Sequence, residues 1–248
     1  MPTKIPRLVG HRGWPARYPE NTVEGFAAAA QQGARWLECD IQLSSDCTPF
    51  VAHDESLART AGINRSITEM SAAELSSITV GERRRFGGKY TEAKLPTLHA
   101  LITWLETQPQ VHLFAEIKRQ SLRHFGRDTV VRQVLEVCQG LMQRCTIISF
   151  DHVCLGLARA HGAITIGWAT EEYTSEALRV VQALKPDYLF TSDEMFADVH
   201  KSMPGSWEWA VYETQDPRRA LQLAEQGASF VETNDIGGML QAPGFSPA

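Results

Sequence analysis

Several features are scarce in this 248-residue sequence, and each absence excludes a class of protein. No stretch approaches the 18 or more consecutive apolar residues of a membrane-spanning helix. Residues 1–4 lack the apolar core of a signal peptide, so we expect a cytoplasmic protein without a membrane span. The formal net charge is −5, which lacks the positive excess that binding to nucleic acid or to an anionic membrane requires.

Sequence motifs of several common protein classes are also missing. The five cysteines are scattered without a Cys-x-x-Cys pair, which indicates reduced and mostly buried thiols. No Gly-x-Gly-x-x-Gly follows the first apolar run, so a dinucleotide-binding fold has no support. Ser149 lacks a surrounding Gly-x-Ser-x-Gly elbow, so a serine hydrolase is unsupported.

Short apolar runs alternate with helical patterns along the chain. Eight such runs within about 250 residues are typical of an α/β protein with a (β/α)8 TIM barrel, and a doubly wound open sheet is the alternative. Asn21, with Glu24 three residues later, predicts the cap of the first helix. We expect the eight strands near residues 8–9, 36–43, 111–118, 145–149, 163–168, 187–191, 207–211 and 229–233.

Residues 55–95 interrupt this alternation after the second strand. Ser71 and Glu74 have the spacing of a capping box and predict a short helix over residues 71–78. Residues 80–89 show no periodicity, and the arginine run at 83–85 is interpreted as a solvated loop face. We therefore expect a single barrel domain over residues 1–248, with a small insertion at 55–95 that folds over one end as a lid or wall.

Charged side chains fall at the ends of the expected strands. Glu38 and Asp40 point to the same face because side chains in a strand alternate, and they lie about 7 Å apart along it. An edge strand with one solvated face is the alternative, but helical patterns on both sides favour a strand that is covered on both faces. Two ionised carboxylates in such a place repel one another and need a cation.

A third carboxylate, Glu116, can converge on this pair from another strand. Ligation by oxygen alone suits one divalent cation, Mg²⁺ or Ca²⁺. Arg12 and Lys118 add positive charge that suits an anionic substrate such as a phosphate. His11 and His53 supply an acid–base pair, and Asp54 either orients His53 or caps the following turn.

Taken together, these motifs resemble a known enzyme family over nearly the whole chain. His11-Arg12-Gly13, Pro19-Glu20-Asn21-Thr22, Glu38-x-Asp40, His53-Asp54 and Glu116-Ile117-Lys118 look like the signature of the glycerophosphodiester phosphodiesterases, in particular of their cytoplasmic bacterial type. The chain departs from the usual pattern at Cys47, at Ala210 and Tyr212, and at Asn234. These positions bear on substrate preference more than on the chemistry.

The resemblance implies a barrel enzyme that hydrolyses a small-molecule glycerophosphodiester to sn-glycerol 3-phosphate and an alcohol. It implies one divalent metal bound by Glu38, Asp40 and Glu116, with His11 and His53 as the catalytic pair. We assign His11 as the base and His53 as the acid; the sequence leaves open this order, the nucleophile (water or the glycerol 2-hydroxyl), the headgroup and the oligomeric state. The alternatives are a phospholipase D-like enzyme on lysophospholipids or sphingomyelin, and a non-catalytic barrel that binds metal or phosphate.

Overall fold

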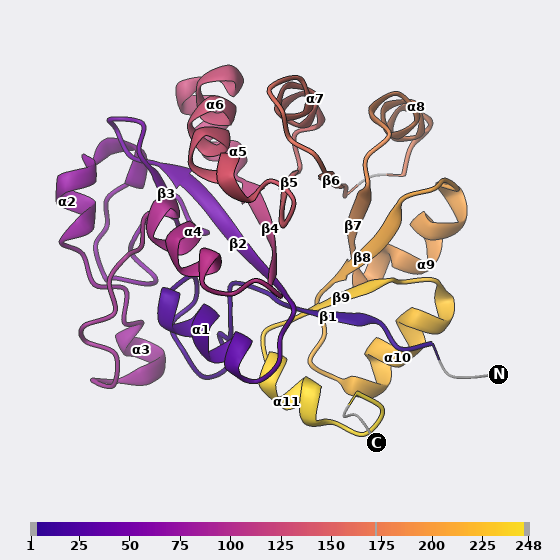
Figure 1. The fold of residues 1–248 in the computed structure, drawn as a ribbon, viewed down its shortest axis with the longest axis horizontal. Helices are drawn as coiled ribbons and strands as arrows, with labels where there is room; N and C mark the ends of the chain where they lie inside the picture. Colours follow the sequence, from indigo (N-terminus) through magenta and orange to yellow (C-terminus); the bar gives the residue numbers. More distant parts are fainter. Residues whose placement is uncertain (1–3, 172, 246–248) are drawn as a thin grey trace.

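The computed structural model describes residues 4–171 and 173–245. Within them, eight parallel strands close into a barrel, and helices pack around its outside (Figure 1). The strand order β1-β9-β8-β7-β6-β5-β4-β2 returns to its start because β1 also pairs with β2. The predicted (β/α)8 barrel is confirmed, and the open-sheet alternative is excluded.

Each of the eight expected strands overlaps one strand of the barrel. The barrel strands are β1 (Arg7–Gly10), β2 (Trp36–Leu43), β4 (His112–Ile117), β5 (Cys145–Ser149), β6 (Ile166–Ala169), β7 (Tyr188–Ser192), β8 (Glu208–Tyr212) and β9 (Phe230–Thr233). The longer helices around them are α1 (Val23–Gln31), α4 (Leu98–Glu106), α5 (Arg119–Phe125), α6 (Arg127–Cys138), α7 (His152–Ala160), α8 (Ser175–Leu184), α9 (Asp193–Ser202), α10 (Pro217–Gln226) and α11 (Ile236–Gln241). A 3-10 turn, η2 (Gln139–Leu141), extends α6.

The alternation of side chains along each strand divides the apolar core into two parts. Leu37 and Ile41 face outward and pack in the layer between the barrel and its helices. Phe114 and Phe230 face inward and belong to an apolar cluster that fills the barrel. An inward side chain two residues further along a strand, such as Glu116, therefore lies above this apolar layer at the C-terminal mouth.

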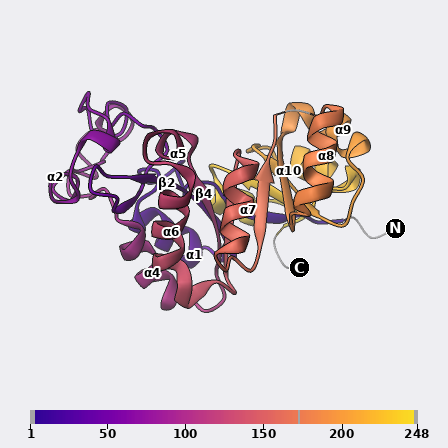
Figure 2. The same cartoon turned by 90° about the horizontal axis from the view of Figure 1, so that it is seen from above.

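The insertion follows β3 (Pro49–Val51), which pairs antiparallel with the end of β2. Residues 55–95 contain η1 (Ile67–Glu69), α2 (Ala72–Ser76) and α3 (Arg83–Phe86). Leu57, Ile67 and Leu75 belong to a separate small apolar cluster. The predicted capping box of Ser71 and Glu74 at α2 is confirmed. Figures 1 and 2 show α2 at the margin of the molecule, beyond the end of β2.

Residues 83–85 are exposed, as expected for a solvated face, but they do not form a loop. These residues begin the short helix α3, which the sequence did not predict. The guanidinium of Arg85 lies 2.6 Å from the buried carboxylate of Glu82 and donates to the backbone oxygen of Pro15 at 2.5 Å. Arg85 therefore connects the insertion to the loop between β1 and α1.

One other local expectation was wrong. The cap of α1 is Thr22, whose hydroxyl accepts from the backbone N–H of Gly25 at 3.2 Å. Asn21 instead has a left-handed backbone, with φ of 56°, and points its side chain elsewhere. Helix α5 was not predicted, because its polar sequence buries only Ser121 and Leu122 and shows no apolar periodicity.

The buried positions of most cysteines agree with the sequence prediction. All five thiols are free, and Cys47 alone among them is not fully buried. None of the helices in residues 4–171 and 173–245 has both the length and the apolar composition needed to cross a bilayer.

Candidate active site

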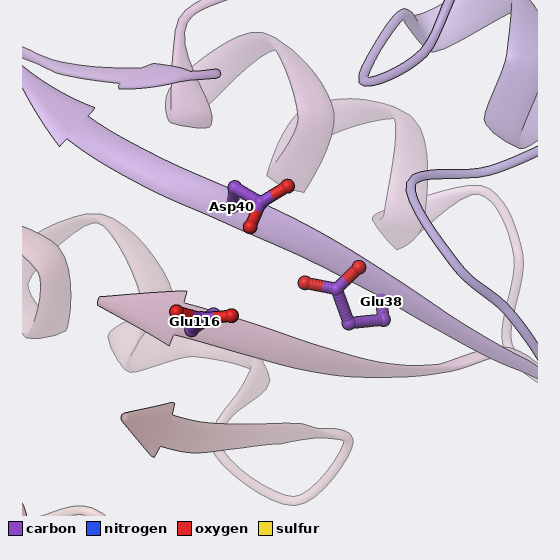
Figure 3. A group of neighbouring side chains, drawn as sticks. All are labelled: Glu38, Asp40 and Glu116. Atoms are coloured by element: carbon purple, nitrogen blue, oxygen red, sulfur yellow. The ribbon is translucent and has the colours of Figure 1, made fainter. Parts of the chain in front are cut away.

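Strands β2 and β4 place three carboxylates together at the mouth of the barrel. The parallel register sets Asp40 beside Glu116, and Glu38 lies one inward-facing position before Asp40. One oxygen atom of each side chain lies within 4.8 Å of those of the other two. Figure 3 shows the three side chains directed toward one another from the two strands. The predicted ligands therefore form one cluster.

Two cationic side chains flank this cluster. Lys118 Nζ lies 3.2 Å from Asp40 Oδ1 and 2.9 Å from Glu116 Oε1. Arg12 Nε lies 3.2 Å from Asp40 Oδ2. Burial by itself would raise the pKa of Asp40, but the charges of Lys118 and Arg12 outweigh burial and lower it. Asp40 is therefore ionised at neutral pH.

Glu38 lies in a different environment from Asp40. Burial and the charge of Asp40 raise its pKa well above the ordinary value. Its Oε2 accepts from the backbone N–H of Arg12 at 3.1 Å, whereas its buried Oε1 has no hydrogen-bond partner in the described part of the chain. A buried carboxylate oxygen without a donor is costly, and a divalent cation would satisfy it. The residues present therefore fit Mg²⁺ or Ca²⁺.

Asn21 orients the middle carboxylate of the cluster. Its Nδ2 donates to Asp40 Oδ2 at 2.9 Å, and the backbone N–H of Asp40 donates to Asn21 Oδ1 at 3.3 Å. The left-handed backbone of Asn21 directs the side chain to this position instead of capping α1. The residue was noted in the sequence, but its role was missed.

His11 follows β1 directly, and its ring lies between two carboxylates. Nδ1 lies 2.8 Å from Glu213 Oε2, and Nε2 lies 3.8 Å from Glu38 Oε2. Burial by itself would lower the pKa of His11, but the hydrogen bond to Glu213 and the charges of Glu38 and Glu232 raise the pKa to about 10. His11 is therefore protonated at neutral pH.

His53 is oriented by a chain of polar contacts from the insertion. Its Nδ1 lies 2.7 Å from Asp54 Oδ1, so Asp54 orients the histidine, which was one of its two expected roles. Arg59 Nε donates to the other Asp54 oxygen at 2.7 Å. The same guanidinium donates to both carboxylate oxygens of Glu20, at 2.6 and 2.8 Å.

A cavity of about 200 Å³ opens at this end of the barrel. Six of the seven expected site residues line it: His11, Arg12, Glu38, His53, Glu116 and Lys118. Asp40 does not line the cavity, but it contacts Arg12 and Lys118, which do. Ile148, Ala169 and Phe190 form an apolar wall on the side of β5 to β7.

Sequence reasoning missed the residues that β8 and β9 bring to the cavity. Glu213 follows β8 and binds His11, while Glu232 lies on β9 and is 3% exposed. Asn234 Oδ1 lies 3.2 Å from His11 Nδ1. Glu232 had a usable signal, because it shares a strand face with the apolar Phe230. Glu213 directly follows β8, and a charged residue at the end of a strand was the same signal that identified His11.

Comparison with known proteins identifies relatives of this chain. Residues 11–160, more than half of the chain, match the model of the glycerophosphoryl diester phosphodiesterase family. A glycerophosphoinositol inositolphosphodiesterase from Mus musculus is 35% identical over 157 residues, which cover 55% of this chain and 29% of that protein. The chain therefore spans less than a third of that relative's length.

Other relatives match over most of their length. A glycerophosphodiester phosphodiesterase from Caldanaerobacter subterraneus is 25% identical over 227 residues, which cover 89% of this chain and 91% of that protein. A phosphodiesterase from Oleispira antarctica, solved in complex with the product sn-glycerol-3-phosphate, has the same fold, with a TM-score of 0.83, 24% identity and 95% of each chain covered. Because the family match extends over more than half of the chain and includes all seven expected site residues, the chain belongs to the glycerophosphoryl diester phosphodiesterase family.

Proposed function

We propose that this chain hydrolyses glycerophosphodiesters to sn-glycerol 3-phosphate and an alcohol, with one divalent cation and a pair of histidines. The main support is the carboxylate cluster, whose buried Glu38 oxygen lacks a partner in the described residues and which shares one cavity with His11 and His53. Membership of the family supports the choice of substrate class.

Glu38, Asp40 and Glu116 would bind Mg²⁺ or Ca²⁺. A bound cation of this kind attracts the non-bridging phosphate oxygens and lowers the pKa of a hydroxyl beside it. Arg12 and Lys118 line the same cavity, and their charges attract the phosphate from the side of β1 and β4. These two residues therefore position the diester for attack.

His11 and His53 transfer the protons. Each ring is oriented at Nδ1 by a carboxylate, Glu213 for His11 and Asp54 for His53, which leaves Nε2 of each ring for proton transfer. One histidine accepts a proton from the nucleophile, and the other protonates the departing alkoxide. The raised pKa of His11 favours a role as the proton donor. A cation on Glu38 would offset the charge that raises this pKa. The pH profile of kcat/KM must therefore decide which histidine is the acid and which is the base.

The proposal is tested with four substrates in the presence and absence of Mg²⁺. These are glycerophosphocholine, glycerophosphoethanolamine, lysophosphatidylcholine and bis-p-nitrophenyl phosphate. We expect Mg²⁺-dependent release of sn-glycerol 3-phosphate from the two glycerophosphodiesters, and loss of that release in Glu38→Gln. Turnover of lysophosphatidylcholine alone would indicate a phospholipase D-like enzyme. No turnover of any substrate would indicate a non-catalytic barrel.

A further inference from the structure

Glu232 is a buried carboxylate in the cavity that the proposed chemistry does not use. It lies two residues after Phe230 on β9, so its side chain faces into the barrel directly above that ring. It is 3% exposed and lines the same cavity as His11 and Glu116. Glu232 is therefore placed to contact whatever fills the cavity.

One oxygen of this carboxylate has no donor within residues 4–171 and 173–245. Glu232 Oε1 is buried and accepts no hydrogen bond from that part of the chain. Its charged neighbours do not supply one, because Glu116 is itself an acceptor, and the ring of His11 has Nδ1 on Glu213 and Nε2 3.8 Å from Glu38 Oε2. A buried acceptor is normally satisfied, so the missing donor belongs to the occupant of the cavity.

The wall on the side of β5 to β7 restricts what that occupant can be. Ile148, Ala169 and Phe190 are apolar and line this side of the cavity. The site therefore offers a phosphate-attracting group of cations, an acceptor at Glu232 and an apolar face. A three-carbon polyol ester of phosphate has the matching parts: an anionic end, hydroxyl donors and C–H groups.

We propose that Glu232 accepts a hydrogen bond from a hydroxyl of the glycerol moiety and is a specificity-determining residue for that end of the substrate. This inference rests on the proposed function. A site that hydrogen-bonds a substrate hydroxyl discriminates against analogues that lack it, because the buried acceptor is then left unpaired. Glu232 thus selects glycerol esters over simple alkyl esters of phosphate.

The experiment measures binding without turnover. Burial raises the pKa of Glu232 to about 7, so the measurement is made at about pH 8, where the carboxylate is ionised. Mg²⁺-loaded protein is titrated calorimetrically with sn-glycerol 3-phosphate and with n-propyl phosphate, which has the same carbon chain without hydroxyls. We expect the wild type to bind the glycerol ester about 10- to 100-fold more tightly, as a hydrogen bond to a charged group implies. In Glu232→Leu the two dissociation constants should agree within about threefold. Loss of the negative charge strengthens the binding of both phosphates alike, so their ratio isolates the hydroxyl.

Two further variants control this result. Glu232→Gln retains an acceptor oxygen, so its ratio of dissociation constants should be intermediate and at least about threefold below that of the wild type. This variant replaces Glu232→Leu as the test if the leucine variant does not fold. Glu213→Gln alters the partner of His11, lowers turnover and should leave the binding ratio unchanged.

Several outcomes would overturn the inference. Glu232 does not bind the hydroxyl if Glu232→Leu keeps the wild-type ratio of the two dissociation constants, or if the wild type shows no preference for the glycerol ester. A second Mg²⁺ per chain that is lost in Glu232→Leu would make Glu232 a cation ligand instead. A wild type that prefers the glycerol ester but hydrolyses no glycerophosphodiester would reject the proposed function and retain the role of Glu232. Hydrolysis without the preference would reject Glu232 alone.

Discussion

At the scale of single residues, a carboxylate contacts one ring nitrogen of each of the two histidines in the cavity. Glu213 contacts Nδ1 of His11, and Asp54 contacts Nδ1 of His53. A ring oriented in this way presents Nε2 in a fixed direction, which proton transfer requires. The two histidines come from distant parts of the chain and reach one cavity because His11 follows β1 and His53 follows β3.

Replacement of either histidine should strongly lower the activity. We expect His11→Ala and His53→Ala each to lower kcat by about 10²–10⁴-fold. The double variant should be far less impaired than the product of the two effects, since the residues act as a unit. His99→Ala, at an exposed position of α4, is the matched control and should be fully active. An active His53→Ala with an unchanged pH profile would exclude His53 from the mechanism.

The carboxylate cluster should make the protein's stability depend on divalent cations. Mg²⁺ or Ca²⁺ at about 100 times its dissociation constant should stabilise the wild type by about 2.7 kcal/mol. For this chain length, that is a rise in Tm of about 5–10 °C. Without metal, Glu38→Gln should melt no lower than the wild type, because burial and the charge of Asp40 disfavour a carboxylate at this position and the amide cannot ionise.

The same thermal melts provide a control variant, and one outcome would contradict the metal site. Glu38→Gln should lose most of the metal-induced rise in Tm, whereas Glu225→Gln, at an exposed position of α10, should retain it. If Glu38→Gln melts markedly lower and the wild type does not respond to cations, the carboxylates are structural acceptors. The metal-dependent mechanism would then be wrong.

At the scale of elements, a few ion pairs connect the insertion to the loop before α1. Arg59 in the insertion binds Glu20, and the backbone N–H of Glu20 donates to Glu82 at 2.7 Å. The orientation of His53 depends on the same arginine, through Asp54. The insertion thus supports the site through these contacts.

The contact between Arg59 and Glu20 should make the insertion sensitive to acid. Burial would raise the pKa of Glu20, but Arg59 and Arg12 outweigh it and lower the pKa below 4.5. Because the folded pKa lies below the unfolded value, the pair's stabilisation is fully present above pH 4.5 and is lost as pH falls through the lowered pKa. Protection of residues 55–95 against hydrogen exchange, corrected for the intrinsic exchange rate at each pH, should therefore fall below about pH 4.5.

Replacement of the arginine should reproduce this effect at neutral pH. Arg59→Ala leaves Glu20 buried with Arg12 as its remaining cationic partner, and should lower protection of the insertion by about 1–3 kcal/mol at pH 7. It should also flatten the acid dependence. Arg65→Ala, which removes an exposed contact to Glu74 in the same insertion, is the control and should change neither quantity. Equal behaviour of the two variants would contradict the assigned role of Arg59.

Local signals predicted most elements, and tertiary contacts account for the exceptions. The capping box at Ser71 was sufficient to place α2. The signal at Asn21 was equally good, yet its side chain binds Asp40 and Thr22 caps the helix. Competition from a buried carboxylate is invisible in a local sequence window.

The same contrast between local signals and tertiary contacts applies to the site. Glu38, Asp40 and Glu116 were predicted to converge because strand alternation and neighbouring strands place them together. Glu213 and Glu232 contribute only because the last two strands return to the side of β1. The closure of a barrel brings together residues that no spacing rule connects.

At the scale of the whole molecule, aromatic rings inside the barrel support the mouth. Phe114 is fully buried, and its ring centroid lies 5.1 Å from those of Tyr188 and Phe190 and 5.5 Å from that of Phe230. Glu116 is the next inward residue on the same strand. The cluster therefore stabilises the barrel and supports the carboxylates above it.

Removal of this central ring should destabilise the entire fold. Phe114→Ala should lower the free energy of unfolding in urea by about 3–5 kcal/mol, because a large buried side chain leaves a cavity. Val153→Ala, on the exposed face of α7, is the control and should change it by less than about 0.5 kcal/mol. A loss below about 1 kcal/mol in Phe114→Ala would show that the rings are loosely packed.

The pairing of β1 with β9 also affects how the chain is made. Arg7 leaves the ribosome more than 200 residues before its partner Phe230, a wait of roughly 10–45 s at usual rates of synthesis. During that time β1 has an open edge, and His11 lacks Glu213. A nascent chain arrested before residue 207 would contain all seven expected site residues, yet it should bind chaperones and show no catalysis.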